Sequence, residues 1–156
     1  MVYLDETNRK MLDILQLDGR ISYKELGQRV GLTPPAVAER MRKLEEAGVI
    51  KGFRAIVDYE VLGFPLLCII RMNVGGQANL NVDQTLADTP QIIEANRVTG
   101  SDSHVVRARV RNTFGIEELL RDVWKEGDTI TNLVTSSPVP FRPMNLAATD
   151  AGREHS

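Results

Sequence analysis

Basic side chains gather between residues 20 and 43, where they could bind a polyanion. This stretch holds six Lys or Arg residues and two acids, although the 156-residue chain carries a net charge of −2. The six bases are Arg20, Lys24, Arg29, Arg40, Arg42 and Lys43. A local basic patch on an acidic protein favours contact with phosphates. The alternative is a solvated helix surface, and charge alone does not separate the two.

Other residue types give little basis for catalysis or metal binding. His104 and His155 are the only histidines and Cys68 is the only cysteine, so no metal-ligand spacing exists and we expect no metal or cofactor. A lone cysteine in an apolar run suggests a reducing compartment. The chain has no apolar run of about 20 residues, and its start lacks the order of a signal peptide. We therefore expect a cytoplasmic protein with no membrane partner.

The basic stretch belongs to a predicted set of three helices. Apolar residues at helical spacing predict the first over residues 4–18, and capping signals predict the second over 22–31 and the third over 33–47. Ser22 and Glu25 have the capping-box spacing. Gly27 is small enough to let the second and third helices approach each other. This arrangement predicts a helix-turn-helix, in which the third helix enters the major groove of DNA.

Two adjacent prolines stand at the start of the third helix. With Thr33 as the N-cap, Pro34 and Pro35 fall in the first turn, where N–H groups have no intrahelical partner and proline is tolerated. The exposed side of this helix is short at its start and basic farther along, which suits close approach to base edges. A helical wheel places Arg40 toward the core, so it is the weakest candidate. The predicted DNA-binding residues are Ser22, Lys24, Thr33, Pro34, Pro35, Ala38, Glu39, Arg40, Arg42 and Lys43.

The rest of the chain predicts a second, mixed domain. β-branched and aromatic residues predict a strand over 49–58, and later segments predict the order β-α-β-β-α-β of a ferredoxin-like fold. The fold class is therefore α+β. The predicted domains are a DNA-binding domain at 1–50, a linking strand or hinge at 51–63, a C-terminal domain at 64–137 and an extended, frayed tail at 138–156. Apolar candidates for a sheet face that a second copy would cover are Leu67, Ile69, Val105 and Val110.

The N-terminal sequence resembles that of the Lrp/AsnC (leucine-responsive/asparagine) transcriptional regulators. The resemblance rests on Leu4-Asp5, Asp18-Gly19-Arg20, Glu25-Leu26, Val30-Gly31-Leu32, Leu44-Glu45 and Gly48-Val49-Ile50, with further single positions up to Leu62-Gly63. It continues to about residue 136 through the strand order, Val98-Thr99-Gly100 and Thr135. The resemblance implies a winged helix-turn-helix domain and a C-terminal domain for effector binding and oligomerisation.

The same resemblance implies partners and a second site. Its members bind double-stranded DNA, form homodimers that often assemble into octamers, and bind small molecules, usually amino acids, between dimers. Carried over by position, the effector-binding residues are Gly100, Ser101, Asp102, Ser103, His104 and Thr135. This chain has Ser103 and His104 where the family usually has Asp and an aromatic residue. Asp102 is thus one residue out of place as a partner for an ammonium group, and Gly100 could equally be an ordinary hairpin turn.

Two alternatives remain open beside the expected non-enzymatic regulator. Siroheme decarboxylases resemble the same family, and His104 with Arg107, Arg109 and Arg111 could be assigned to hold a polycarboxylate macrocycle. The retained basic side of the third helix and the single plausible histidine argue against that enzyme. The other alternative is an assembly or ligand-binding module that binds no DNA.

Overall fold

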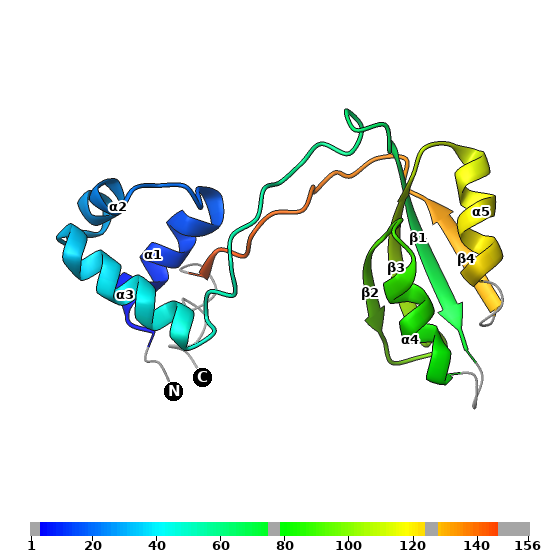
Figure 1. Ribbon diagram of the computed structural model, residues 1–156, viewed down its shortest axis with the longest axis horizontal. Helices are drawn as coiled ribbons and strands as arrows, with labels where there is room; N and C mark the ends of the chain where they lie inside the picture. The colour runs from blue at the N-terminus through cyan, green and yellow to red at the C-terminus, as the bar shows by residue number, and fades with distance from the viewer. Residues whose placement is uncertain (1–3, 75–78, 124–127, 147–156) are drawn as a thin grey trace. The chain divides into compact units, whose positions relative to one another are not determined.

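The chain divides into two compact units. The computed structural model describes residues 4–74, 79–123 and 128–146. One unit contains residues 57–138, and the other contains residues up to 56 together with those from 139 onward (Figure 1). None of the helices within the described ranges is long and apolar enough to cross a membrane.

The first unit contains the three predicted helices. They are α1 (Glu6–Leu17), α2 (Tyr23–Val30) and α3 (Pro34–Glu46). The Asp5 side chain caps α1 by accepting from the Asn8 N–H, and Ser22 caps α2 by accepting from the Glu25 N–H. The Glu25 carboxylate pairs with Arg29, so only the Ser22 half of the capping box accounts for this helix start. Buried apolar residues of the three helices, together with Ile21 between α1 and α2, form one core: Met11, Leu15, Ile21, Leu26, Val37 and Met41.

Gly27 is the point of closest approach between α2 and the segment that leads into α3. A β-carbon at Gly27 would lie 2.5 Å from the backbone oxygen of Leu32 and 3.4 Å from Cγ2 of Val37. The Leu32 N–H also donates to the Gly27 oxygen at 2.9 Å. The expected role of Gly27 is confirmed, because any larger residue would push the turn away from α2.

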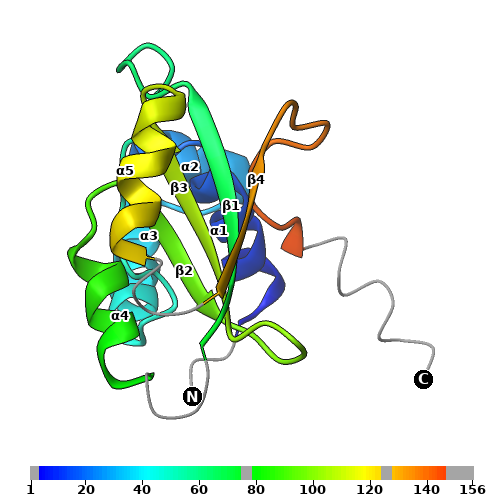
Figure 2. The same cartoon turned by 90° about the vertical axis from the view of Figure 1, so that its right-hand side faces the viewer.

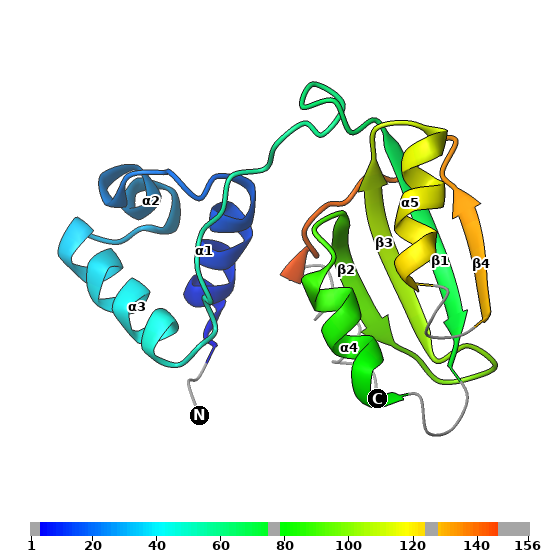
Figure 3. The ribbon, with the colours of Figure 1, turned by 45° about the vertical axis from the view of Figure 1, so that its right-hand side comes forward.

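The second unit has the predicted β-α-β-β-α-β order. Its elements are β1 (Leu66–Asn73), α4 (Asn79–Asp88), β2 (Ile92–Arg97), β3 (His104–Val110), α5 (Thr113–Val123) and β4 (Asp128–Leu133). The strands lie in the order β2-β3-β1-β4, and each neighbouring pair is antiparallel. Both helices cover the same face of the sheet (Figures 2 and 3). The sequence predicts the helix that corresponds to α5 over residues 114–127, and the last four of these residues, with Trp124, lie outside the described ranges.

The two faces of the sheet have different compositions. Residues of β3 are alternately buried and half-buried, and the buried ones belong to the core beneath α4 and α5. Leu67, Ile69 and Val105 are half-buried and lie on the opposite, uncovered face, as predicted. The assignment of Val110 to that face is wrong, because Val110 is 2% exposed and packs in the helix-covered core. We call the uncovered side the open face.

The predicted strand over residues 49–58 is absent. Residues 51–58 have neither helix nor strand structure, and a turn follows at 59–63. Val57 and Ile56 are exposed, and the hydrogen-bonded sheet among the described residues does not include this segment. β-branched composition favours extended backbone, but a strand also needs a hydrogen-bonded neighbour.

The described part of the C-terminal tail does not fray away from the chain. The Leu146 N–H donates to the Asp13 carboxylate at 3.0 Å, and the Gln16 side chain donates to the Met144 oxygen at 3.2 Å. Residues 139–146 thus return to α1 within the first unit, whereas the prediction was an extended, frayed tail. The sequence could not show this, because the partners lie more than 120 residues apart.

Replacing Gly27 by alanine should destabilise the first unit by about 1–3 kcal/mol, the usual range for overpacking. Alanine in place of glycine inside a helix normally stabilises a protein by about 0.5–1 kcal/mol. The sign of the change in the free energy of unfolding therefore distinguishes overpacking from the usual effect. Urea unfolding followed by circular dichroism measures the change. Gln28→Ala, at the exposed neighbouring position, is the control and should leave the midpoint nearly unchanged. Equal or greater stability of Gly27→Ala would contradict the close approach.

Candidate DNA-binding surface and effector turn

The start of α3 is exposed and has few backbone donors. Thr33 is the N-cap residue, and Pro34 and Pro35 occupy the first helical positions as predicted. Because proline has no N–H, Ala36 is the residue of this first turn whose N–H has no intrahelical acceptor; the Val37 N–H already donates to Thr33. The Thr33 side chain makes no capping bond. This helix N-terminus therefore offers a phosphate fewer N–H donors than a helix that starts without proline.

Most of the predicted DNA-binding residues share the solvent side of α3 and the start of α2. The core side of α3 is formed by Val37, Met41 and Leu44. Ala38 is half-buried at the margin of the solvent side. The exposed members of the predicted set are Ser22, Lys24, Thr33, Pro34, Pro35, Glu39, Arg42 and Lys43. The structure thus leaves the short helix start and three cations, Lys24 of α2 and Arg42 and Lys43 of α3, exposed to solvent.

The cations of this surface are partly neutralised by carboxylates on the same helix. Arg42 bonds Glu39 at 2.7 Å and Glu46 at 2.5 Å, and Lys43 lies 3.4 Å from Glu39. These contacts raise the pKa of Arg42, and the hydrogen bond from Arg42 lowers the pKa of Glu39. Exposed pairs of this kind contribute little to stability, so a phosphate can displace them at small cost.

Arg40 does not belong to the exposed set. Its Nη1 donates to the Asp5 carboxylate at 2.7 Å and to the Asn8 side-chain oxygen at 2.8 Å. The predicted DNA contact of Arg40 is therefore replaced by a tie between α3 and the start of α1. The helical wheel had placed Arg40 toward the core, and the half-buried position in the structure agrees with the wheel.

Arg20 is a candidate phosphate contact that the predicted set left out. It is exposed in the turn before α2, and its side chain has no ion pair within the described residues. Lys24 is likewise exposed and without an ion pair in that part of the chain. The local excess of bases was the signal that could have added Arg20 to the set.

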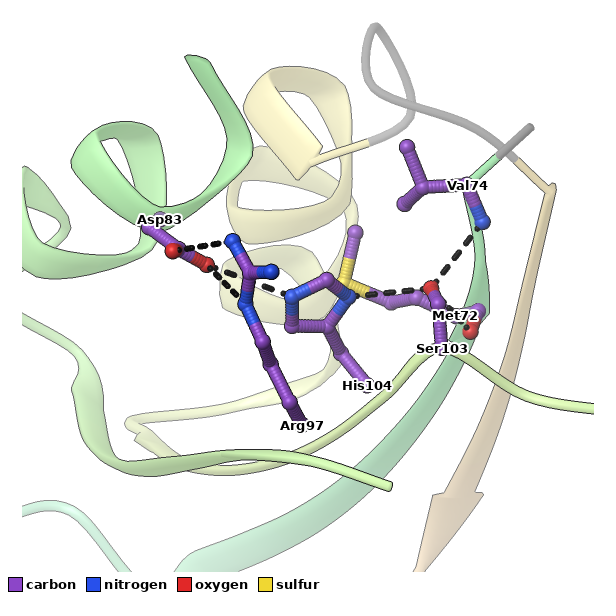
Figure 4. A network of polar contacts seen from close by, with 6 residues as sticks. All are labelled: Met72, Val74, Asp83, Arg97, Ser103 and His104. Carbon is purple, nitrogen blue, oxygen red and sulfur yellow. Dashed lines mark hydrogen bonds and ion pairs between the residues drawn. The ribbon is translucent and has the colours of Figure 1, made fainter. Parts of the chain in front are cut away.

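The predicted effector residues 100–104 follow β2 and run through the turn to His104, the first residue of β3. Gly100 has a φ of 114°, in the region that favours glycine. The Ser103 hydroxyl oxygen accepts from the Val74 N–H at 3.0 Å and lies 3.0 Å from the Met72 oxygen (Figure 4). We call residues 100–104 the effector turn. Hydrogen bonds at Ser103 fix its last residues to the end of β1.

His104 is a structural residue within this turn. Its side chain is 3% exposed, with Nδ1 2.9 Å from the Ser103 hydroxyl and Nε2 3.2 Å from the Asp83 carboxylate (Figure 4). Asp83 also pairs with Arg97, and mainly through this bond the pKa of Asp83 is lowered. The imidazole therefore connects the effector turn to α4. It does not present a reactive group to solvent.

Asp102 is the one carboxylate of the effector turn, and it already has a cationic partner. Nε of Arg71 donates to its carboxylate at 2.8 Å. This bond raises the pKa of the Arg71 guanidinium. A ligand ammonium would therefore have to compete with Arg71 for Asp102.

Thr135 does not join the effector turn within one chain. Val134 donates to Leu67 near the start of β1, whereas Ser103 donates to Met72 near its end. Five residues of strand separate these two points, which corresponds to about 17 Å. The predicted set of effector residues thus falls into two places on a single chain. Within the described residues there is also no cluster of His, Cys, Asp or Glu that could hold a metal ion.

Comparison with protein families assigns each unit. The family model for winged helix-turn-helix DNA-binding matches residues 4–51. The model for the Lrp/AsnC ligand binding domain matches residues 67–144. Together they span both the helical unit and the sheet.

Individual relatives match over most of their length. The chain is 39% identical over 119 residues to the HTH-type transcriptional regulator FL11 of Pyrococcus horikoshii, covering 76% of this chain and 79% of the relative. It is 36% identical over 142 residues to the leucine-responsive regulatory protein of Rhizobium meliloti, covering 86% and 90%.

Solved structures have the same fold. LrpC of Bacillus subtilis superposes with a TM-score of 0.83 at 27% identity, covering 87% of this chain and 97% of the other. A feast or famine regulatory protein of M. tuberculosis, complexed with L-methionine, gives a TM-score of 0.81 at 26% identity, covering 90% and 100%.

The Asp5 carboxylate should make the stability of the first unit depend on acid. Its capping bond from the Asn8 N–H, and next its bond from Arg40, lower its pKa in the folded protein. The stabilisation that the Asp5 carboxylate provides is complete above the ordinary Asp pKa of about 4. It is lost as the pH falls through the lower pKa that Asp5 has in the folded protein. Asp5→Ser retains a capping oxygen but no charge, so it should unfold with a weaker pH dependence below about pH 4. Thermal unfolding at several pH values measures this. An unchanged pH profile would contradict the role of the Arg40–Asp5 pair.

Proposed function

Because this chain belongs to the Lrp/AsnC family of DNA-binding transcriptional regulators, we propose that the exposed side of α3 reads its operator. The observation that carries this proposal is the exposed start of α3, where Thr33, Pro34 and Pro35 leave no long side chain between the helix and a base edge. Arg42 and Lys43 follow on the same side. In this arrangement α3 lies in the major groove, and DNA phosphates or bases replace Glu39 and Glu46 as partners of Arg42.

Phosphate contacts at the start of α2 complete the proposed surface. Lys24 and Arg20 are exposed there, and the Ser22 hydroxyl still has its proton available after accepting from the Glu25 N–H. Phosphate contacts fix register and orientation, whereas base contacts specify sequence. We assign DNA binding to residues 1–50, linkage to 51–63, effector binding and assembly to 64–137, and no separate function to 138–156.

The family assignment also decides between a regulator and an enzyme. The relatives are transcriptional regulators, so this chain is a regulator and not a decarboxylase. The structure gives a physical reason that agrees: His104, the residue the enzyme would need, is buried and bonded to Ser103 and Asp83.

The effector of the second unit is proposed to be an amino acid. Support comes from the match to the Lrp/AsnC ligand binding domain and from a structural relative complexed with L-methionine. Asp102 is the natural partner for the ammonium group, and binding would exchange Arg71 for the ligand. Because Thr135 lies about 17 Å away on the same chain, we propose that another subunit supplies it.

Assembly follows from the open face of the sheet. Leu67, Ile69 and Val105 are only half-buried there, and a second copy packed on the same face would cover them. We propose a homodimer that assembles further, up to an octamer, in the cytoplasm.

Arg42→Ala should weaken operator binding by about 1–3 kcal/mol if Arg42 reads a base. Lys24→Ala should weaken binding to all DNA sequences about equally. It should also reduce the slope of the logarithm of the binding constant against the logarithm of salt concentration by about one. Fluorescence anisotropy at several salt concentrations, on a fragment recovered by genome-wide mapping of bound sites, measures both. Arg107→Ala, at a half-buried arginine of the second unit that pairs with Glu94, is the control and should bind as the wild type. Unchanged binding by Arg42→Ala would remove this side of α3 from the interface.

Asp102→Asn should abolish amino-acid binding while leaving operator affinity without effector unchanged. The reason is that the amide removes the only carboxylate of the effector turn but keeps its size. Thermal shifts across the amino acids, on both proteins, measure this. Arg71→Gln is the companion variant and should increase amino-acid affinity, since it removes the competing cation. Equal shifts in the wild type and Asp102→Asn would exclude Asp102 from the effector site.

A further inference from the structure

Three arginines at alternate positions, Arg107, Arg109 and Arg111, differ in their partners. Arg107 pairs with Glu94 at 2.9 Å. Arg109 instead lies over the Tyr59 ring at 5.4 Å, and Arg111 lies over the Phe64 ring at 4.5 Å. Neither of these two has a carboxylate partner in the described ranges 4–74, 79–123 and 128–146. Two guanidinium charges are thus placed close to the start of β1 without a counter-ion from that part of the chain.

Arg109 has an unused donor in a buried position. Its Nη1 donates to the Pro65 oxygen at 3.1 Å, which orients the guanidinium. Its Nε, in contrast, is buried and has no hydrogen-bond partner among the described residues. A buried N–H of a charged group that lacks an acceptor destabilises the protein, because its hydrogen bond to water is lost and not replaced. An acceptor supplied from outside would remove that cost.

A cavity of about 370 Å³ lies at these two arginines. Its walls include Arg109, Arg111, Tyr59, Phe64, Ile93 and Gln91, and no Asp or Glu from the described part of the chain lines it. Cavities of about 300–1,000 Å³ accommodate small molecules. The aromatic and aliphatic walls suit an apolar body, and the rings hold both guanidinium groups in place through cation–π contacts.

We propose that this cavity binds a small carboxylic acid that has an apolar body and no ammonium group, such as a 2-oxo acid. The carboxylate accepts from Arg109 and Arg111, whose forks match its geometry. The Gln91 amide can donate to an oxo group. An amino acid of the same size is disfavoured, because its ammonium would lie beside two cations with no acid to balance it.

This site is separate from the proposed effector turn. The cavity lies near Pro65 at the start of β1, whereas the effector turn is bonded to Met72 near its end. The distance along the strand is about 23 Å. Loss of amino-acid binding at Asp102, or of DNA binding at α3, would therefore leave the inference unaffected.

The test compares 4-methyl-2-oxopentanoate with leucine, which has the same carbon skeleton and an ammonium group. Isothermal titration of the full chain should show binding of the oxo acid, weakened about ten-fold or more in Arg109→Gln and in Arg111→Gln. Arg107→Gln is the matched control, because Arg107 lies on the same strand and is paired with Glu94; it should bind the oxo acid as the wild type. Any leucine response should be the same in the wild type and in Arg109→Gln.

Several outcomes would overturn the inference. One is the absence of heat with 4-methyl-2-oxopentanoate, phenylpyruvate and 4-methylpentanoate at millimolar concentration. Another is an equal loss of affinity in Arg107→Gln, which would indicate a general charge effect. A third is binding of inorganic phosphate as tight as that of the acids, which would remove the role of the apolar body. The last is a change of oligomeric state in Arg109→Gln without acid binding by the wild type, which would assign the arginines to a carboxylate of a second copy.

Discussion

The missing side chain of Gly27 is the constraint on which the DNA-binding unit depends. With no β-carbon there, the Leu32 backbone lies against α2 and Val37 can enter the core. This contact fixes the direction in which α3 leaves the turn. The direction in turn decides which residues are buried, Val37, Met41 and Leu44, and which remain for DNA. The prolines then define the first turn of α3 without using side-chain capping.

Charge on α3 is organised differently in the free protein and in the proposed complex. In the free protein, Glu39 and Glu46 neutralise Arg42, so this helix is not a strongly positive surface. In the proposed complex, phosphates or base edges must replace these weakly bound carboxylates as partners of Arg42. This exchange favours binding to a matching DNA sequence over general electrostatic attraction. Arg40 has the opposite role, because it bonds Asp5 and Asn8 and keeps the start of α1 against α3.

Local signals predicted the parts of the fold that depend on neighbours in sequence. Ser22 and Thr33 marked the starts of α2 and α3 correctly, and the order of the second unit followed from periodicity. Except for the assignment of Val110, the errors concern tertiary partners. Residues 49–58 look like a strand but have no neighbour among the described strands, and Val110 was assigned to the wrong face although strand alternation places it with Val106. Two features depend on the register of β1 with its neighbouring strands: the bond between Arg71 and Asp102, and the distance of Thr135 from the effector turn. The composition of the sequence does not give this register.

Site-directed crosslinking tests the central claim, that the exposed side of α3 contacts DNA, most directly. Cys68 is fully buried and burial raises the pKa of its thiol, so an introduced surface cysteine can be labelled selectively. A short photocrosslinker attached to Glu39→Cys in α3 should join to operator DNA at bases in the major groove. The same label at Glu117→Cys in α5 should give no such product. Crosslinks from Glu117→Cys and none from Glu39→Cys would contradict the account.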